Sequence, residues 1–217
     1  MKTRFKLWAA LVLLATVGAT LWLYGALPER IPSHWNAAGQ VDGWGPRGSI
    51  FTEPAIMLGL ALLWLVLPGI SPKRFEVEGF EDTWWFGGMA LLALLAFIQA
   101  MLLGAALGAG IDIGRALGGG LGAFILLLGN VMGKVRRNFW LGIRTPWTLA
   151  NERVWYATHR LAGKTMVGAG LLTIGVALAG WPAWIGTALL LAGVLVPAGY
   201  SLLYYKRLQR EGRLESA

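Results

Sequence analysis

Long apolar runs alternate with shorter polar segments along most of this chain. Most of the runs contain about 20 residues, enough for a helix to cross the roughly 30 Å hydrocarbon core of a bilayer. The six runs lie at residues 7–27, 50–70, 84–107, 116–132, 165–180 and 183–205. The pattern predicts an all-α fold: a polytopic membrane protein built as a bundle of six transmembrane helices.

The fifth run is short for a membrane span, so its helix is expected to begin upstream, in the polar segment that precedes it. In that segment Thr145 followed by Pro146 suits an N-cap and a first helical residue, and Thr148 is a second candidate cap. A helix begun at either position would continue through Trp155 and His159 into the membrane.

The segment from Asn130 to Lys164 is polar, basic and rich in Trp, and it is much longer than a connector needs to be. It holds seven of the 19 Lys and Arg residues. Its middle reads Gly142-Ile143-Arg144-Thr145-Pro146-Trp147-Thr148. Such a row of glycine, threonine and proline suggests a specified shape. We therefore predict a structured loop at residues 130–164 between the fourth and fifth helices.

The composition also indicates a membrane protein. Only 14% of the residues are charged, against about 25% in a typical soluble domain. The net charge of +8 does not indicate nucleic-acid binding, because the basic residues lie between apolar runs and no nucleic-acid-reading motif accompanies them. We interpret these residues as topology signals and contacts to lipid headgroups. The absence of Cys excludes disulfides, thiol catalysis and Cys-ligated metal sites.

The distribution of basic residues predicts the orientation. Six spans place both termini on one side, and all of the 19 Lys and Arg lie on that side except Arg30, Arg47 and Arg115. Because basic loops stay in the cytoplasm, both termini and the loop 130–164 are predicted to be cytoplasmic, with residues 28–49 outside.

The outer connector, residues 28–49, contains three prolines and several glycines, so we expect an irregular loop with turns. Four residues make it too apolar for a plain linker: Ile31, Trp35, Val41 and Trp44. We expect the connector to fold onto the membrane face or to cover a cavity.

The two histidines are candidates for chemistry. His34 could bind a metal together with Glu29, Asp42 or Glu53, but the spacing matches no helix-borne zinc motif, which favours a hydrogen-bonding role. We expect no metal and no cofactor.

On the inner side, Glu152 and His159 are two helical turns apart and share a predicted face with Trp155. They are interpreted as a proton-coupled pair or, preferably, as residues that hold the long loop in place. Arg144 could clamp a carboxylate or a phosphate, or hold the loop to Glu152.

Three features lie within or beside the predicted spans. Gln99 is interpreted as a helix–helix hydrogen bond, with a transport role as the alternative. Gly114, Gly118 and Gly122 repeat every four residues, which favours a packing seam over a ligand groove. Pro197 is expected to kink the sixth helix.

Pieces of the polar segment resemble the SdpI family, six-span bacterial membrane proteins named after an immunity protein against a sporulation-delaying toxin. The matching residues are Asn130, Gly133-Lys134, Asn138-Phe139, Gly142 to Leu149, Val154-Trp155 and Thr158-His159-Arg160. The outer loop, with Ile31-Pro32, His34-Trp35-Asn36, Gly39 and Asp42-Gly43-Trp44, resembles the small domain that often precedes this region. Arg137 departs from the pattern, since relatives tend to have proline there.

The resemblance implies a non-enzymatic protein of the bacterial inner membrane. It would sense or neutralise an extracytoplasmic toxic peptide and signal to a cytoplasmic repressor-type protein. The residues expected to bind the cytoplasmic partner or a ligand are Asn130, Lys134, Asn138, Gly142, Arg144, Thr145, Pro146, Trp147, Thr148, Glu152, Trp155 and His159. Those expected to bind at the outer loop are His34, Trp35, Asn36, Asp42 and Trp44.

The resemblance also divides the chain into an N-terminal two-helix region, residues 1–75, and an SdpI-like four-helix region, residues 76–217. Two other functions stay open. One is a small-solute transporter with its site at the Gly118 seam, Gln99 and the Pro197 kink. The other is a membrane metalloenzyme that uses His34 or His159.

Overall fold

The computed structural model describes residues 1–36 and 39–214. The helices are α1 (Lys2–Tyr24), α2 (Thr52–Val66), α3 (Glu81–Ala106), α4 (Ile113–Met132), α5 (Pro146–Ala150), α6 (Glu152–Ala179) and α7 (Ala183–Arg210). The strands are β1 (Arg30–Trp35) and β2 (Val41–Pro46), and the 3-10 turns are η1 (Arg47–Phe51), η2 (Leu67–Ile70) and η3 (Lys73–Phe75).

The six predicted spans are confirmed. Within the described residues, six helical stretches are long and apolar enough to cross a membrane, and the second of them is α2 extended by η1 and η2. The fifth span begins upstream of Thr165, as expected, but neither Thr145 nor Thr148 caps it. Thr145 caps only the short helix α5, and Asn151 begins α6 by accepting a hydrogen bond from the Val154 amide. The expectation of one continuous helix is therefore wrong.

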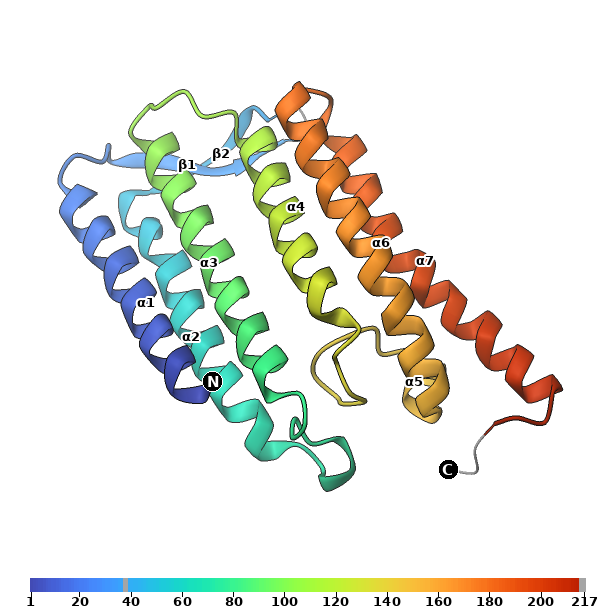
Figure 1. Ribbon diagram of the computed structural model, residues 1–217. Coiled ribbons are helices and arrows are strands. Elements are labelled where there is room, and N and C mark those ends of the chain that lie inside the picture. The colour runs from blue at the N-terminus through green and yellow to red at the C-terminus, as the bar shows by residue number, and fades with distance from the viewer. Residues whose placement is uncertain (37–38, 215–217) are drawn as a thin grey trace.

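The helices form two groups that lie side by side (Figure 1). Helices α1, α2 and α3 make one group, and α4, α6 and α7 make the other. The packing-seam interpretation holds at Gly122, because a Cβ atom there would lie 3.0 Å from the Gly170 carbonyl oxygen of α6. A side chain at Gly118 would instead meet no atom within 4 Å, and Gly118 lines a cavity of about 290 Å³ between α4, α6 and α7.

The outer connector is a β-hairpin and not the irregular loop that its prolines and glycines suggested. Strands β1 and β2 pair antiparallel, with register irregularities on either side of His34. Both strands are edges, so Pro32 and Pro46 remove no hydrogen bond that an inner strand would need. Ile31 is buried against Leu27, Ile50 and Leu103, which anchors the hairpin on the helices as expected.

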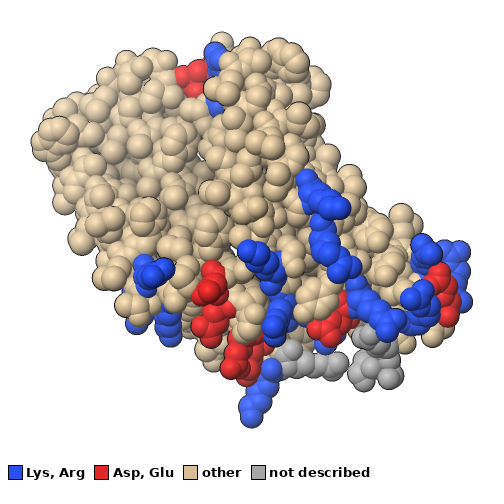
Figure 2. Space-filling view, viewed as in Figure 1, with Lys and Arg blue, Asp and Glu red and all other residues tan. Residues whose placement is uncertain are grey.

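The two ends of the bundle differ in charge. The hairpin end carries β1 and β2, and the opposite end, called here the polar end, carries both termini and the segment between α4 and α6 (Figure 1). Most acidic and basic side chains gather at the polar end (Figure 2). The termini and the segment therefore lie on one side of the bundle, as the sequence predicts.

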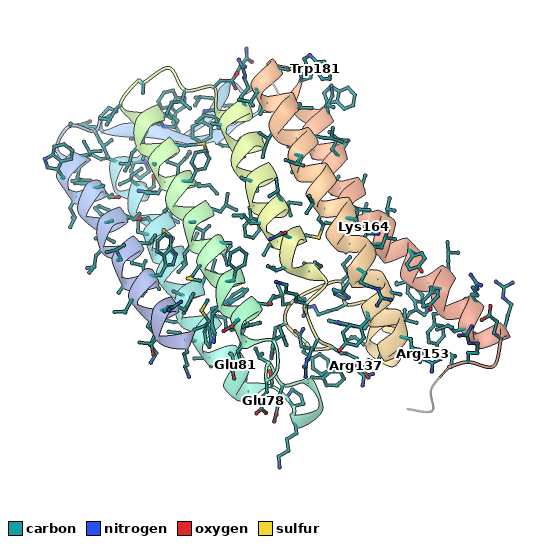
Figure 3. All side chains as sticks on the ribbon, in the orientation of Figure 1. Glu78, Glu81, Arg137, Arg153, Lys164 and Trp181 are labelled. Atoms are coloured by element: carbon teal, nitrogen blue, oxygen red, sulfur yellow. The ribbon has the colours of Figure 1, made fainter. Side chains whose placement is uncertain are left out.

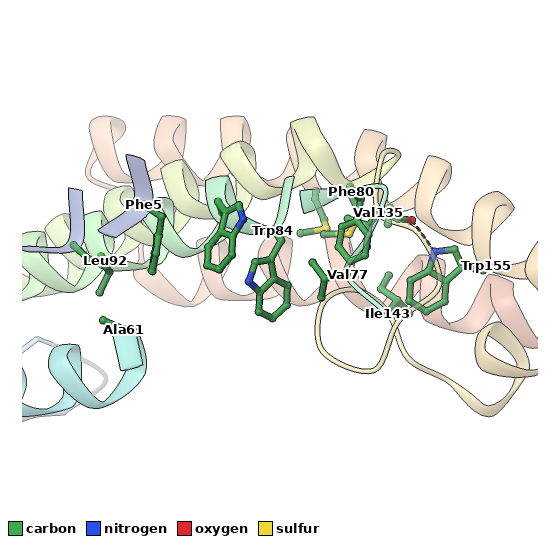
Figure 4. Close-up of a cluster of buried hydrophobic side chains, with 14 of the residues drawn as sticks. Phe5, Ala61, Val77, Phe80, Trp84, Leu92, Val135, Ile143 and Trp155 are labelled. Atoms are coloured by element: carbon green, nitrogen blue, oxygen red, sulfur yellow. Dashed lines mark hydrogen bonds between the residues drawn. The ribbon is translucent and has the colours of Figure 1, made fainter. Parts of the chain in front are cut away.

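A cluster of buried apolar side chains joins this segment to the first group of helices (Figure 4). Phe5 of α1 packs on Trp85 of α3, with ring centroids 5.2 Å apart. Trp84 belongs to the same cluster, as do Val135 of the segment between α4 and α6 and Trp155 of α6. The polar end is therefore held by a core that both groups share.

Candidate functional site

The loop is shorter than the predicted 130–164, because α4 continues to Met132 and α6 begins at Glu152. The residues between, 133–151, called here the motif loop, fold into a fixed shape through side-chain bonds to the backbone. The Asn138 amide nitrogen donates to the carbonyl oxygens of Arg136 and Leu141, at 2.7 and 3.0 Å. Its carbonyl oxygen accepts from the amides of Trp140 and Leu141, each at 2.7 Å. Asn138 is fully buried. One asparagine thus satisfies four backbone groups in the turn.

His159 of α6 supports the second turn of the motif loop. The Ile143 amide donates to Nε2 of His159 at 2.9 Å, and Nδ1 lies 2.8 Å from the Trp155 carbonyl oxygen. The imidazole stacks on the Trp155 ring, with centroids 4.0 Å apart. Gly142 has φ +116°, and a Cβ atom there would lie 2.3 Å from Nε2. Only glycine fits both the conformation and the space.

Two threonines tie the next turn to α7. Thr145 and Thr148 form a reciprocal capping box around Pro146 at the start of α5. The Thr148 hydroxyl also donates to the Ile143 carbonyl at 2.8 Å, and the Thr145 hydroxyl lies 2.9 Å from that of Ser201 on α7. Residues 142–148 of the motif loop are therefore held by α6 on one side and by α7 on the other.

Two tryptophans attach the motif loop to the remaining chain. The Trp155 indole donates to the Val135 carbonyl at 2.8 Å within the buried cluster. The Trp140 indole donates to the Ser71 hydroxyl in the connector between α2 and α3. Trp147, which lies between these two tryptophans in the sequence, is half-buried. The loop is thus bonded to both groups of helices.

Glu152, His159 and Arg144 do not converge, which corrects the proton-coupled and Arg144–Glu152 interpretations. Glu152 is exposed at the start of α6, while His159 is buried and bonded to the backbone. Arg144 is exposed and its guanidinium donates to the Phe139 carbonyl. The spacing placed both residues on one face, but Glu152 is the first residue of α6 and lines the open pocket at its end, whereas His159 lies two turns further along the helix and is buried.

A shallow pocket of about 380 Å³ opens beside the motif loop at the polar end. It is lined by residues of both charges: Lys73, Glu76, Glu78, Arg136, Arg137 and Glu152. Figure 3 shows Glu78 and Arg137 at this end of the molecule. Lys134, two residues before Arg136 in the sequence, is exposed. The motif loop thus presents a polar surface on one side while its buried side chains hold it from the other.

Arg137, the departure from the family pattern, has a structural role. Its guanidinium donates to the Leu149 carbonyl at 3.3 Å and lies 5.6 Å from the centre of the Phe75 ring. A proline could make neither contact, so the arginine supplies two tethers for the beginning of the loop.

The outer-loop candidates divide into a polar pair, a turn residue and aromatic residues. His34 Nδ1 lies 2.5 Å from the Asp42 carboxylate across the hairpin, and both side chains are largely exposed. Asn36 closes the turn through bonds to Gln40. Trp44 is 53% exposed and Trp35 is half-buried. The hairpin therefore displays a hydrogen-bonded His34, as favoured from the sequence.

The features assigned to a metalloenzyme or a transporter do not form one site. Within residues 1–36 and 39–214, no three His, Asp or Glu side chains are placed to hold a metal ion. Gln99 donates to the Thr20 hydroxyl and the Ile50 carbonyl, at 3.0 and 3.1 Å. It therefore bonds toward α1 and η1, away from Gly118 and from Pro197 on α7.

Three supporting residues were missed from the sequence. Asn151 caps α6, and an asparagine three residues before Val154 was a readable cap signal. Ser71 and Ser201 contact the motif loop from distant parts of the chain. Single serines carry no local signal of such contacts.

Comparison with known proteins adds a family to this geometry. Residues 134–205 match the family model described as the SdpI/YfhL protein family. Residues 11–58 match a domain of unknown function, DUF1648. The chain is similar to the immunity protein SdpI of Bacillus subtilis (strain 168), at 31% identity over 150 residues, which is 69% of this chain and 70% of that protein. No solved structure matches the chain.

Proposed function

Because the chain belongs to the SdpI/YfhL protein family, we propose that it is a toxin-immunity protein of the bacterial cytoplasmic membrane. Its hairpin end faces outward and neutralises or senses an extracytoplasmic antimicrobial peptide. Its polar end, with both termini, faces the cytoplasm and signals to a repressor-type protein. The similarity to the Bacillus subtilis immunity protein carries this proposal. The protein acts by binding and change of shape, without catalysis.

The charge distribution supports the proposed orientation. Basic side chains gather at the polar end (Figure 2), and short basic segments of membrane proteins stay on the cytoplasmic side. Few charges lie at the hairpin end in the same view. The motif loop is then cytoplasmic and the hairpin extracytoplasmic.

The hairpin end offers a surface suited to an amphipathic peptide. Four tryptophans near this end are more than half exposed: Trp22, Trp44, Trp181 and Trp184. Figure 3 shows Trp181 at this end, far from Arg137 and Arg153. Indole rings favour the membrane–water interface, where an amphipathic toxic peptide also lies. These rings support peptide contact at the outer membrane surface.

Helix α3 supports the signalling part of the proposal because it contacts both ends. Near its C-terminus, Leu103 and Ala106 pack with Ile31 of the hairpin. Near its N-terminus, Trp84 packs in the buried cluster that contains Val135 of the motif loop. A shift of α3 caused by peptide binding would therefore act directly on the motif loop.

The mixed-charge pocket beside the motif loop supports a cytoplasmic partner. It presents carboxylates and cations on one polar surface, Glu78 and Glu152 together with Arg136 among them. Charge complementarity of this kind gives a protein interface its orientation and partner choice. We infer that the repressor-type partner contacts this surface.

Expression in toxin-sensitive bacteria tests the proposal. Cells that produce the chain should survive exposure to the peptide toxin, with the protein confirmed in the membrane fraction. The variant Trp44→Ala should lower survival without changing insertion. The variant Arg136→Ala, which removes a cation of the mixed-charge pocket, should remove recruitment of the partner, whereas the control Arg210→Ala, which removes an equal charge at the same end, should retain it.

Two results would contradict the proposal. Cells with a normal amount of inserted protein and no gain in survival would exclude an immunity role against the toxin used. Equal survival of wild-type and Trp44→Ala cells would place recognition away from Trp44 of the hairpin. Loss of recruitment in Arg210→Ala as complete as in the pocket variant would place the partner outside the pocket.

A further inference from the structure

A groove of about 710 Å³ lies between α4 and α6 toward the polar end, with α7 at its edge. Arg160 and Lys164 line it from α6, one helical turn apart. Asn130 of α4 and Tyr200 of α7 add an amide and a phenol hydroxyl. None of the described residues that line the groove is Asp or Glu. The groove therefore carries two positive charges without a compensating carboxylate.

Neither cation has a partner within the described part of the chain. Arg160 and Lys164 are exposed and take part in no hydrogen bond or ion pair there. Other basic side chains at this end do have partners, such as Arg207, which lies 2.8 Å from Glu211. The two cations of the groove are thus free to bind an anion from outside the protein.

Lys164 is exposed on the side of the bundle, at the level of its apolar part. The next residue, Thr165, is level with Gly193 of α7, because its hydroxyl donates to the Gly193 carbonyl at 2.7 Å. The cations of α7 begin at Lys206, about 20 Å further along that helix. Only about 22 Å of helix separates Lys164 from Ala179, less than the roughly 30 Å of hydrocarbon. Figure 3 shows Lys164 well above the labelled Arg137 and Arg153 on the way to the hairpin end.

A cation at this depth is costly unless it reaches the headgroup layer or meets an anion. The groove provides space for the cation to extend toward the headgroups and for an anion to enter, because glycines form its floor. A Cβ atom on Gly163 would lie 3.1 Å from the Gly129 carbonyl oxygen, so the two backbones meet there without side chains. A Cβ atom on Gly133 would meet nothing within 4 Å. A ligand can therefore approach the helices closely.

We propose that this groove binds the phosphodiester headgroup of an anionic phospholipid. Arg160 and Lys164 contact the phosphate oxygens, with the guanidinium able to donate two parallel hydrogen bonds. The acyl chains lie along the apolar wall that contains Leu161 and Val167. Basic pockets between transmembrane helices on the cytoplasmic side suit anionic headgroups. Inorganic phosphate shares the charge but lacks the acyl chains, so it binds more weakly.

The test uses the full chain, delipidated in detergent. Phosphatidylglycerol, phosphatidylcholine and inorganic phosphate are added in separate titrations, and bound lipid is counted by native mass spectrometry. The double variant Arg160→Gln/Lys164→Gln should lower the affinity for phosphatidylglycerol about tenfold or more. The variant Gly133→Leu, which keeps both charges and fills the groove, should lower it as well.

The control is Lys206→Gln/Arg210→Gln, which removes the same charge outside the groove and should retain wild-type affinity. Thermal unfolding without lipid shows that each variant is folded, and Gly133→Leu carries the test if the double variant is not. The proposal is overturned by equal affinity for the two lipids, by phosphate binding as tightly as phosphatidylglycerol, or by wild-type affinity in Gly133→Leu.

Discussion

His159 is a neutral imidazole whose two ring nitrogens are both used by the backbone. Nε2 accepts a hydrogen bond from the Ile143 amide, so the ring proton is on Nδ1, which donates a hydrogen bond to the Trp155 carbonyl. Neither nitrogen is left for a metal ion or a mobile proton. The ring supports the motif loop, which is the interpretation that the sequence favoured over a proton-coupled site.

We expect His159→Ala to open the motif loop while the six spans stay folded. The change leaves the buried Ile143 amide without an acceptor, which costs about 1–3 kcal/mol. Hydrogen exchange at this amide and proteolysis within residues 133–151 measure the opening. The neighbouring variant Arg160→Gln, at an exposed position, is the control. Unchanged exchange at Ile143 in His159→Ala would refute this role.

Gly142→Ala should destabilise the loop by about 2 kcal/mol or more, because the left-handed backbone strains an alanine and its methyl group would overlap His159. Gly133→Ala is a matched control, since Gly133 has helical dihedrals and open space around its Cβ position. Thermal unfolding in detergent compares the two. Equal melting temperatures would show that the loop adapts to the methyl group.

At the scale of elements, the contact between α4 and α6 depends on glycines at which the backbones touch. A Cβ atom on Gly170 would lie 2.5 Å from the Gly122 carbonyl oxygen, a backbone atom that cannot rotate away. Close approach through small residues stabilises helix pairs in a bilayer, where the hydrophobic effect between helices is absent. This seam therefore holds the second group of helices together.

Gly170→Ala should separate α4 from α6 and lower stability by about 1–3 kcal/mol, the usual cost of overpacking. Gly168→Ala lies on the same helix with no atom within 4 Å of the new methyl group. It should be neutral or slightly stabilising, since alanine favours helices. Unfolding in detergent separates the variants, and similar losses in both would argue against a seam at Gly122.

For the whole molecule, the orientation is the prediction with the widest consequences. The chain has no Cys, so single cysteines can be labelled without background. Trp44→Cys should react with a membrane-impermeant maleimide on intact cells. Lys134→Cys should react only after permeabilisation, because the positive-inside rule places the polar end in the cytoplasm. The reverse pattern would reject the orientation and the proposed partner side.

The division of the chain at residue 75 stays a prediction.

The number of spans could be predicted from the sequence because it depends on the length and hydrophobicity of each apolar run. An apolar run of about 20 residues finds its lowest free energy across the hydrocarbon core, whatever its neighbours are. The Gly122 seam followed for a similar reason, because residue spacing on a helix determines which residues share a face. Helix ends were less certain, and the cap at Asn151 was missed.

The site depended on contacts between residues far apart in the chain. The sequence marked Gly142, Thr145 and His159 as parts of one segment, but the bond from Ile143 to His159 exists only because α6 turns that ring toward the loop. Glu152, on the same face but at the first position of the helix, is exposed. The hairpin likewise needs the apolar support of α3 beneath Ile31. Lipid solubility of each run is a local property, whereas the direction of a side chain is set by the packing of the whole bundle.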